Sequence, residues 1–224
     1  MEYLTSGITA NADMYLTPDT MIQASEDCGF RTTVIGAVND FTQSVKEVEN
    51  WYEKYHKEDG LTSYELGFHA EYTTKREILE GISELSKKYH APIYTHNSES
   101  ASEVAQCVER TGMTPTVYME QLGLFEYGGG LYHCVHMSEE DLDVVKRHQI
   151  SVITNPASNL KLASGIAPIE EMLKRNIDLA IGTDGPASNN CLDMFREMFL
   201  VTALAKYREN DASAVDATEV LKMA

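Results

Sequence analysis

Basic residues and long apolar runs are both scarce in this sequence. It holds 18 lysines and arginines against 35 aspartates and glutamates, so its formal net charge is −17. A surface of that sign repels phosphates, which argues against nucleic acid and anionic membranes as partners. No apolar run reaches the about 18 residues of a membrane span, and no signal-peptide pattern occurs. We therefore expect no membrane partner and no secretion, and we expect a cytoplasmic location.

Cysteine motifs and nucleophile motifs are also missing. Cys28, Cys107, Cys134 and Cys191 form no Cys-x-x-Cys, which argues against a zinc knuckle or a disulfide framework and predicts reduced thiols. No Gly-x-Gly-x-x-Gly follows the first expected strand, which weakens a dinucleotide-binding hypothesis. No Gly-x-Ser-x-Gly is present, and we expect Cys134 to point away from the side of His133. A serine or cysteine nucleophile is therefore disfavoured.

What the chain does contain is an alternation of short apolar strands and amphipathic helices. Its 43% hydrophobic content is enough for one sizeable core, and we expect residues 1–224 to form one partial catalytic domain. The expected strands are Ile8–Asn11, Arg31–Val38, Tyr64–His69, Pro92–His96, Leu131–His136, Ser151–Asn155 and Asp178–Asp184. The expected helices are 18–28, 42–57, 73–90, 100–111, 114–124, 138–149, 167–176, 192–209 and 215–224. This alternation predicts an α/β fold with a parallel sheet, either open and doubly wound or closed as a (β/α)8 barrel.

Polar side chains at the carboxyl ends of the expected strands favour the barrel. They are Asp13, His69, His96, His133, Asn155 and Asp184. In a barrel these ends form one face, where active sites are built, whereas an open sheet gathers them only around its switch point. The sequence shows seven strands and a closed barrel of this type has eight, so we expect one strand to be missing.

The sequence also indicates where two helices begin. Ser138 and Asp141 have the spacing of a capping box, with aspartate in the usual place of glutamate. Residues 188–190 are candidate caps for the helix expected over 192–209.

The seven histidines fall into two groups. Three end expected helices beside lysine or arginine, where they complement the helix dipole and face solvent; they are His56, His90 and His148. The other four lie on or just after expected strands; they are His69, His96, His133 and His136.

The strand histidines lie close in sequence to residues that could share their chemistry. In "IYTHNSES", His96 stands three residues before Glu99, which pairs an imidazole suited to Zn²⁺ or Fe²⁺ with a carboxylate suited to proton transfer. In "LYHCVHM", residues three apart point to opposite sides of a strand, so we assign the pocket to His133 and place His136 behind it.

Asp184 ends an apolar strand in "IGTDGPASNN". A buried charge is costly unless it is paired or binds a metal. A turn residue or a helix N-cap is the simpler hypothesis for it. Together with the histidines and Glu99, however, it fits metal-assisted hydrolysis.

Four segments resemble the amidohydrolase superfamily: "HNSE", "YHCVHMSEED", "NPASNLKLASGIAPIEEML" and "IGTDGPASNNCLDMFREM". The nearest branch is the 5-methylthioadenosine/S-adenosylhomocysteine deaminases, with their chlorohydrolase and guanine deaminase relatives. The opening "GITANADMY" is similar to the second barrel strand of this family. The resemblance spans nearly the whole chain and implies a metal-dependent (β/α)8 TIM barrel.

The resemblance also implies a role for each candidate residue. His96 and Asp184 resemble the metal ligands of family strands 5 and 8, and Asp184 would also accept a proton from the attacking water and contact the substrate. His133 resembles the strand 6 histidine that contacts that water. Glu99 resembles the carboxylate that binds the purine and protonates its ring nitrogen. His69 resembles a substrate-binding histidine on strand 4, although Phe68 and residues 70–71 depart from the family wording around it.

The main departure from the family is the absence of His-x-His, the ligand pair of its first strand. The flanking β-sandwich of the family is absent as well. We therefore expect an internal piece of a longer enzyme that starts after strand 1. The cofactor expected is one divalent metal, zinc first and iron or manganese as alternatives, with two further histidine ligands from outside this chain. A metal held by His96 and Asp184 alone would bind weakly, so the piece is expected to be inactive.

The leading hypothesis is hydrolytic deamination of an amino-purine such as 5-methylthioadenosine, S-adenosylhomocysteine or an adenosine-like compound. The alternatives are a guanine deaminase or a chloro-s-triazine hydrolase on the same scaffold, and a barrel without catalytic function. The partner expected in the first two cases is a small-molecule substrate. The sequence leaves a homo-oligomer open.

Overall fold

The computed structural model describes residues 2–224. By contacts between Cα atoms, the chain forms two compact units, which are described one at a time. The β1–β4 unit holds Thr9–His96 and Tyr118–Gly130, and the β5–β7 unit holds residues 2–8, Asn97–Val117 and Leu131–Ala224. None of the helices in the described part of the chain is both long enough and apolar enough to span a membrane.

The β1–β4 unit is built on strands that pair in chain order. Its strands are β1 (Ala10–Met14), β2 (Arg31–Ile35), β3 (Thr62–Ala70) and β4 (Ile93–Asn97). The pairs β1–β2, β2–β3 and β3–β4 are all parallel, with Val34 opposite Tyr64 and Leu66 opposite Ile93. Its helices are α2 (Pro18–Cys28), α3 (Val45–Tyr55) and α4 (Arg76–Tyr89), with the 3₁₀ turn η1 (Glu71–Thr73) after β3. Parallel pairing with helical crossovers is the α/β class that the sequence predicts.

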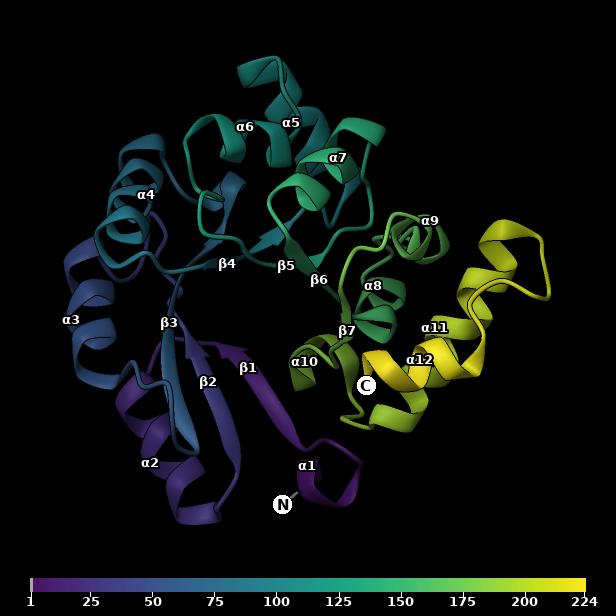
Figure 1. Ribbon diagram of the computed structural model, residues 1–224, viewed down its shortest axis with the longest axis horizontal. Coiled ribbons are helices and arrows are strands. Elements are labelled where there is room, and N and C mark those ends of the chain that lie inside the picture. The colour runs from purple at the N-terminus through teal and green to yellow at the C-terminus, as the bar shows by residue number, and fades with distance from the viewer. Residues whose placement is uncertain (1) are drawn as a thin grey trace. The chain divides into compact units, whose positions relative to one another are not determined.

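Burial explains why these segments take these forms. On β3, Tyr64, Leu66 and Phe68 alternate along the strand and are completely buried, while α4 buries Leu79 and Ile82 at helical spacing. α2, α3 and α4 contact β2 or β3 and line the outer side of β1–β3 (Figure 1). Burying a large apolar side chain contributes about 1.5–3 kcal/mol, so this interface stabilises the unit.

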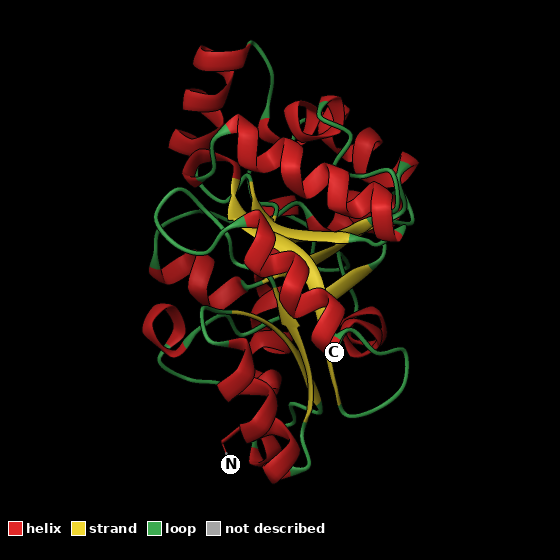
Figure 2. Ribbon diagram, turned by 90° about the vertical axis from the view of Figure 1, so that its left-hand side faces the viewer, coloured by secondary structure: helices red, strands yellow, loops and turns green. Residues whose placement is uncertain are grey.

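The β5–β7 unit contains the later strands and the greater number of helices. Its strands are β5 (Gly129–His133), β6 (Ile150–Thr154) and β7 (Leu179–Ile181), of which β5 begins in the other unit. β6 and β7 pair in parallel, with Ile153 opposite Ala180. The helices are α1 (Glu2–Thr5), α5 (Ala101–Thr111), α6 (Pro115–Gln121), α7 (Glu139–Arg147), α8 (Pro156–Lys161), α9 (Ile169–Lys174), α10 (Pro186–Asn189), α11 (Met194–Glu209) and α12 (Ala217–Met223), with α6 running into the other unit. Helices pack against the strands of each unit (Figure 2).

The run Gly128–Gly130 allows a close approach of two backbones. A Cβ atom on Gly129 would lie 1.9 Å from the carbonyl oxygen of Ile93, and the φ of Gly129 is +146°. No other residue fits there, because both the space and the backbone conformation require glycine. The first glycine of the run follows the turn residues 122–127, and the other two begin β5.

Most differences from the sequence prediction lie at element ends and in short helices. Seven strands are expected and residues 2–224 contain seven, but β1 begins at Ala10, two residues later than expected. Asp193 caps α11, since its carboxylate accepts hydrogen bonds from the amides of Phe195 and Arg196. The prediction of a cap at residues 188–190 is therefore wrong, because α10 intervenes there. The capping box of Ser138 and Asp141 is confirmed.

Candidate active site

The strands place the candidate polar residues at their carboxyl ends. In the β5–β7 unit, His133 is the last residue of β5, Asn155 directly follows β6, and Asp184 lies three residues after β7. In the β1–β4 unit, Asp13, His69 and His96 lie next to the last residue of β1, β3 and β4. Carboxyl ends of parallel strands are the positions from which α/β proteins build active sites.

The backbone is left-handed at several of these strand ends. In the β5–β7 unit, φ is +48° at Ser98, +71° at His133, +48° at Cys134 and +57° at Asp184. Such values are uncommon for residues other than glycine and cost about 1–3 kcal/mol each, so they persist only where neighbouring contacts hold them. The strained residues include two of the three catalytic candidates and the residue before the third, which is Glu99.

Asn159 holds His133 in one tautomer. Its Nδ1 lies 2.7 Å from the Asn159 side-chain oxygen, and the residue is 1% exposed. Because an amide oxygen only accepts, Nδ1 carries the proton, and Nε2 carries the lone pair of the neutral ring. Nε2 lies 3.8 Å from the Oε2 atom of Glu99. Proton exchange by His133 therefore involves the nitrogen that faces the Glu99 carboxylate.

Glu99 is fixed through both its side chain and its backbone. Ser164 Oγ donates to its Oε1 atom at 3.3 Å, and the backbone amide of Glu99 donates to Glu103 at 2.8 Å. Glu103 also accepts from the amide of Ser98 at 2.9 Å and forms a capping box with Ser100 at the start of α5. Burial raises the pKa of the Glu103 carboxyl despite these hydrogen bonds.

Asp184 is held as an anion by two donors. Ser158 Oγ donates to its Oδ2 atom at 2.5 Å, and the amide of Gly185 donates to its Oδ1 atom at 2.6 Å. Burial alone would raise the pKa of this carboxyl. The hydrogen bonds from Ser158 and Gly185 oppose this effect, and the pKa of Asp184 lies below its ordinary value. Asp184 is therefore ionised at neutral pH.

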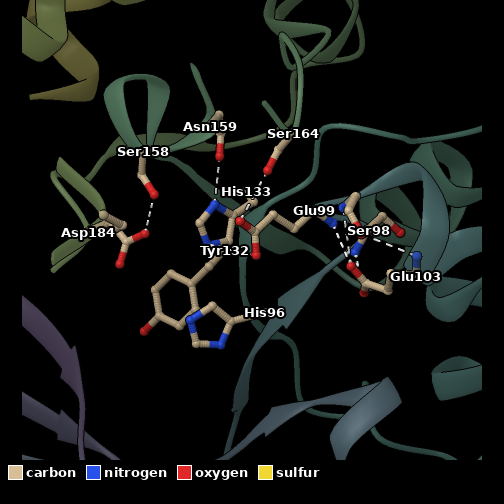
Figure 3. Close-up of polar contacts among 12 residues, drawn as sticks. His96, Ser98, Glu99, Glu103, Tyr132, His133, Ser158, Asn159, Ser164 and Asp184 are labelled. Atoms are coloured by element: carbon tan, nitrogen blue, oxygen red, sulfur yellow. Dashed lines mark hydrogen bonds and ion pairs between the residues drawn. The ribbon is translucent and has the colours of Figure 1, made fainter. Parts of the chain in front are cut away.

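One short segment supports all three catalytic candidates. Ser158 and Asn159 on α8 and Ser164 just after it contact Asp184, His133 and Glu99 in turn (Figure 3). We call these six residues the Glu99–His133–Asp184 cluster; it lies entirely in the β5–β7 unit. His136, which we expected behind the pocket, donates from Nε2 to the Ser164 carbonyl at 2.7 Å and so fixes the end of this segment.

The supporting residues were not identified as site residues from the sequence. Ser158, Asn159 and Ser164 belong to the family-like block "NPASNLKLASG", which was the only available signal. Nothing in their spacing indicates which partner each would take.

His69 and His96 belong to the β1–β4 unit and lie together there. His96 Nδ1 lies 2.6 Å from the His69 carbonyl oxygen, and the two ring centroids are 4.9 Å apart. His69 Nδ1 lies 2.8 Å from Thr73 Oγ1, which itself donates to the Ala70 carbonyl. Nδ1 is therefore the nitrogen that donates in both rings.

The donors present fit a zinc ion in kind. A histidine that ligates a metal through one nitrogen commonly donates its other N–H to a carbonyl, as His96 does to His69. Asp184 offers an ionised carboxylate, the second donor type that zinc takes. Within residues 2–224, however, no three His, Cys, Asp or Glu side chains are grouped closely enough to hold a metal ion. The candidate ligands thus suit zinc chemically but are fewer than the three protein ligands of a catalytic zinc site.

Known proteins resemble this chain over its whole length. The model of the amidohydrolase family matches residues 1–224. A 5-methylthioadenosine/S-adenosylhomocysteine deaminase of Caldanaerobacter subterraneus subsp. tengcongensis is 40% identical over 100% of this chain and 53% of its own length. A 5'-deoxyadenosine deaminase of Methanopyrus kandleri is 35% identical, again over 100% of this chain and 53% of its own.

A solved structure extends the comparison to three dimensions. The adenosine deaminase of Xanthomonas campestris with bound zinc superimposes with a TM-score of 0.93 at 32% identity, covering 100% of this chain and 52% of that one. The chain spans about half the length of the curated relatives it matches. The family model and the full-length match of this chain to its relatives lead to one conclusion: the chain belongs to the amidohydrolase family.

Proposed function

We propose that these residues are part of a metal-dependent deaminase of amino-purines. The substrate would be an adenosine-like compound such as 5-methylthioadenosine, S-adenosylhomocysteine or 5'-deoxyadenosine. Water would replace the amino group on the purine ring carbon, giving a carbonyl and ammonia. The observation that carries the proposal is the Glu99–His133–Asp184 cluster, which offers an anionic base, a polar imidazole and a second carboxyl within one hydrogen-bonded set.

Asp184 has the properties of the group that takes a proton from water. Its lowered pKa keeps it ionised, and the donors Ser158 and Gly185 fix both of its oxygens. A carboxylate fixed in this way can accept a proton without first reorganising. Zinc, when bound, would lower the pKa of water toward 7, and His96 and Asp184 are the residues of this chain that would hold it.

His133 and Glu99 would act on the water and on the ring. The Nδ1–H of His133 is occupied by Asn159, so Nε2 is the atom that would orient the attacking water. Glu99, with a side chain 20% exposed, would give a proton to the ring nitrogen beside the reacting carbon. His69 would contact the substrate. The four cysteines of the chain are all free, which suits a reducing compartment such as the cytoplasm.

The test is ammonia release by the full product of the gene that encodes these residues. Adenosine, 5'-deoxyadenosine, 5-methylthioadenosine and S-adenosylhomocysteine are offered in parallel with guanine and a chloro-s-triazine. We expect release from the adenosine-like compounds and a loss of about 10²–10⁴-fold in Glu99→Gln, since a general acid contributes that much. Glu140→Gln, a change of an exposed glutamate on α7, is the matched control and should keep full activity.

Two results would contradict the proposal. Ammonia release only from guanine, or reaction only with the triazine, would show that the substrate is not an adenosine-like compound. Normal deamination by Glu99→Gln would show that Glu99 does not donate the proton to the ring nitrogen.

A further inference from the structure

A completely buried carboxylate on α11 connects two of the loops at the strand ends. Glu197 is 0% exposed and lies in the first turn of α11, within the β5–β7 unit. Its two oxygens have different partners: Oε2 accepts from the backbone amide of Ala157 at 3.0 Å, and Oε1 accepts from Asn189 Nδ2 at 2.8 Å. Burying a charge in this way is costly, so both contacts are needed to hold it there.

The first contact holds the start of α8. Ala157 lies in the first turn of that helix, where backbone amides have no partner inside the helix. Glu197 supplies the missing acceptor. The next two residues, Ser158 and Asn159, donate to Asp184 and accept from His133. The position of the Ala157 amide therefore sets the position of both supports.

The second contact holds the loop after β7. Asn189 uses the same Nδ2 group to donate to the carbonyl of Thr183 at 2.7 Å, and its Oδ1 atom accepts from Arg196 at 3.0 Å. Contacts at both ends of the amide fix its orientation. Thr183 directly precedes Asp184, so this chain of contacts runs from Glu197 to the backbone that carries the catalytic carboxylate.

We propose that Glu197 is a positioning residue that aligns the α8 segment with the loop carrying Asp184. The short Ser158–Asp184 hydrogen bond joins the two segments and requires both to be placed correctly. The proposal rests on the proposed deaminase function and adds to it a residue that touches neither substrate nor metal.

Only a carboxylate can make both contacts. A glutamine at position 197 has one acceptor oxygen, so one of the two donors would face an amide NH₂ group instead. Burial raises the pKa of the Glu197 carboxyl, which reflects the cost of keeping the charge inside. A residue needed only to fill space could be apolar without that cost.

The test compares three variants of the full gene product. Glu197→Gln weakens the contacts to both segments, because either orientation of the amide leaves one donor facing an NH₂ group. Asn189→Ala leaves the Ala157 contact in place and removes the side chain that links Glu197 to Thr183. The matched control is Asp141→Asn, because Asp141 is equally buried and also accepts from two donors. One is the Ser138 amide in the capping box of α7, and the other is the Thr114 hydroxyl. Deamination kinetics are measured beside hydrogen exchange of the segments 156–161 and 182–185.

We expect Glu197→Gln to lower kcat about 10–100-fold with little change in KM, as for residues that orient catalytic groups. Exchange should become faster at both segments in Glu197→Gln, only at 182–185 in Asn189→Ala, and at neither in Asp141→Asn. The control should keep its kcat even where its melting temperature falls.

Normal kcat in Glu197→Gln, or faster exchange along the whole chain in place of the two segments, would overturn the positioning role. An unmodified protein that releases no ammonia would overturn the proposed function, and the positioning role with it. An active unmodified protein with an unaffected Glu197→Gln variant would overturn the positioning role alone.

Discussion

Replacing Ser158 with alanine should raise the pKa of Asp184 and make stability depend differently on pH. The Ser158 hydroxyl is completely buried and donates to Asp184 at 2.5 Å. A hydrogen bond to a charged group contributes about 1.5–3 kcal/mol, which corresponds to about one to two pKa units. Among the influences on Asp184, burial is the largest and raises the pKa. Without Ser158 less opposes burial, and the pKa of Asp184 should rise.

The sign of the stability change follows from this shift. In the unmodified chain the folded pKa of Asp184 lies below that of the unfolded chain, so its ionisation adds stability above about pH 4 and this is lost as the pH falls through the folded pKa. In Ser158→Ala the folded pKa moves upward, so ionisation adds less stability at pH 7 than in the unmodified chain. The deficit of the variant should be about 1.5–3 kcal/mol at pH 7 and should shrink as the pH falls below both pKa values.

Two measurements on the 224-residue chain, with a chelator present, check this prediction. The chemical shift of the Asp184 carboxyl carbon gives its pKa directly, and urea unfolding between pH 7 and about pH 3.5 gives the free energy of unfolding. Ser86→Ala is the matched control, because this equally buried hydroxyl donates at 2.6 Å to the uncharged carbonyl of Ala91. Its deficit should be about 1–3 kcal/mol at every pH. A deficit in Ser158→Ala that is equally independent of pH would refute the reasoning.

Three further predictions follow from the contacts of the site. Asn159→Leu removes the acceptor that fixes the tautomer of His133, and kcat of the full gene product should fall about 10–100-fold, while unchanged kcat would contradict the assigned orientation. The 224-residue chain, dialysed against dilute zinc, should retain well under one zinc per chain by elemental analysis, because His96 and Asp184 are too few ligands; stoichiometric zinc would contradict this. Glu103→Ala removes the capping box of α5 and should lower the free energy of unfolding by about 0.5–2 kcal/mol in urea titrations, whereas an unchanged midpoint would show that Glu103 contributes no stability.

The fold class and the candidate site residues at the strand ends could be predicted from the sequence, because both depend on local pattern. Apolar runs separated by amphipathic helices indicate parallel strands, and His133 or Asp184 at the end of such a run is visible directly. The short helices α8 and α10 could not be predicted in the same way. They have six and four residues, and a helical period cannot be recognised over so few positions.

The supports of the site depend on contacts between distant positions. Ser158 and Asp184 are 26 residues apart, as are His133 and Asn159, and Ser164 and Glu99 are 65 apart. No local pattern encodes which hydroxyl or amide meets which carboxylate at such separations. The left-handed backbone at His133 cannot be predicted from the sequence either, because histidine adopts that conformation more often than most residues but still uncommonly.

The seven positions from Ser158 to Ser164 give the site a property that individual contacts do not have. Since one segment supports Asp184, His133 and Glu99, a change that tilts it disturbs three groups together. The effects of substitutions at these supports should therefore be non-additive, because the first substitution already disturbs the alignment on which the other contacts depend. Mutational damage to this protein should accordingly be abrupt, with function lost at the first step and little left for a second change to remove.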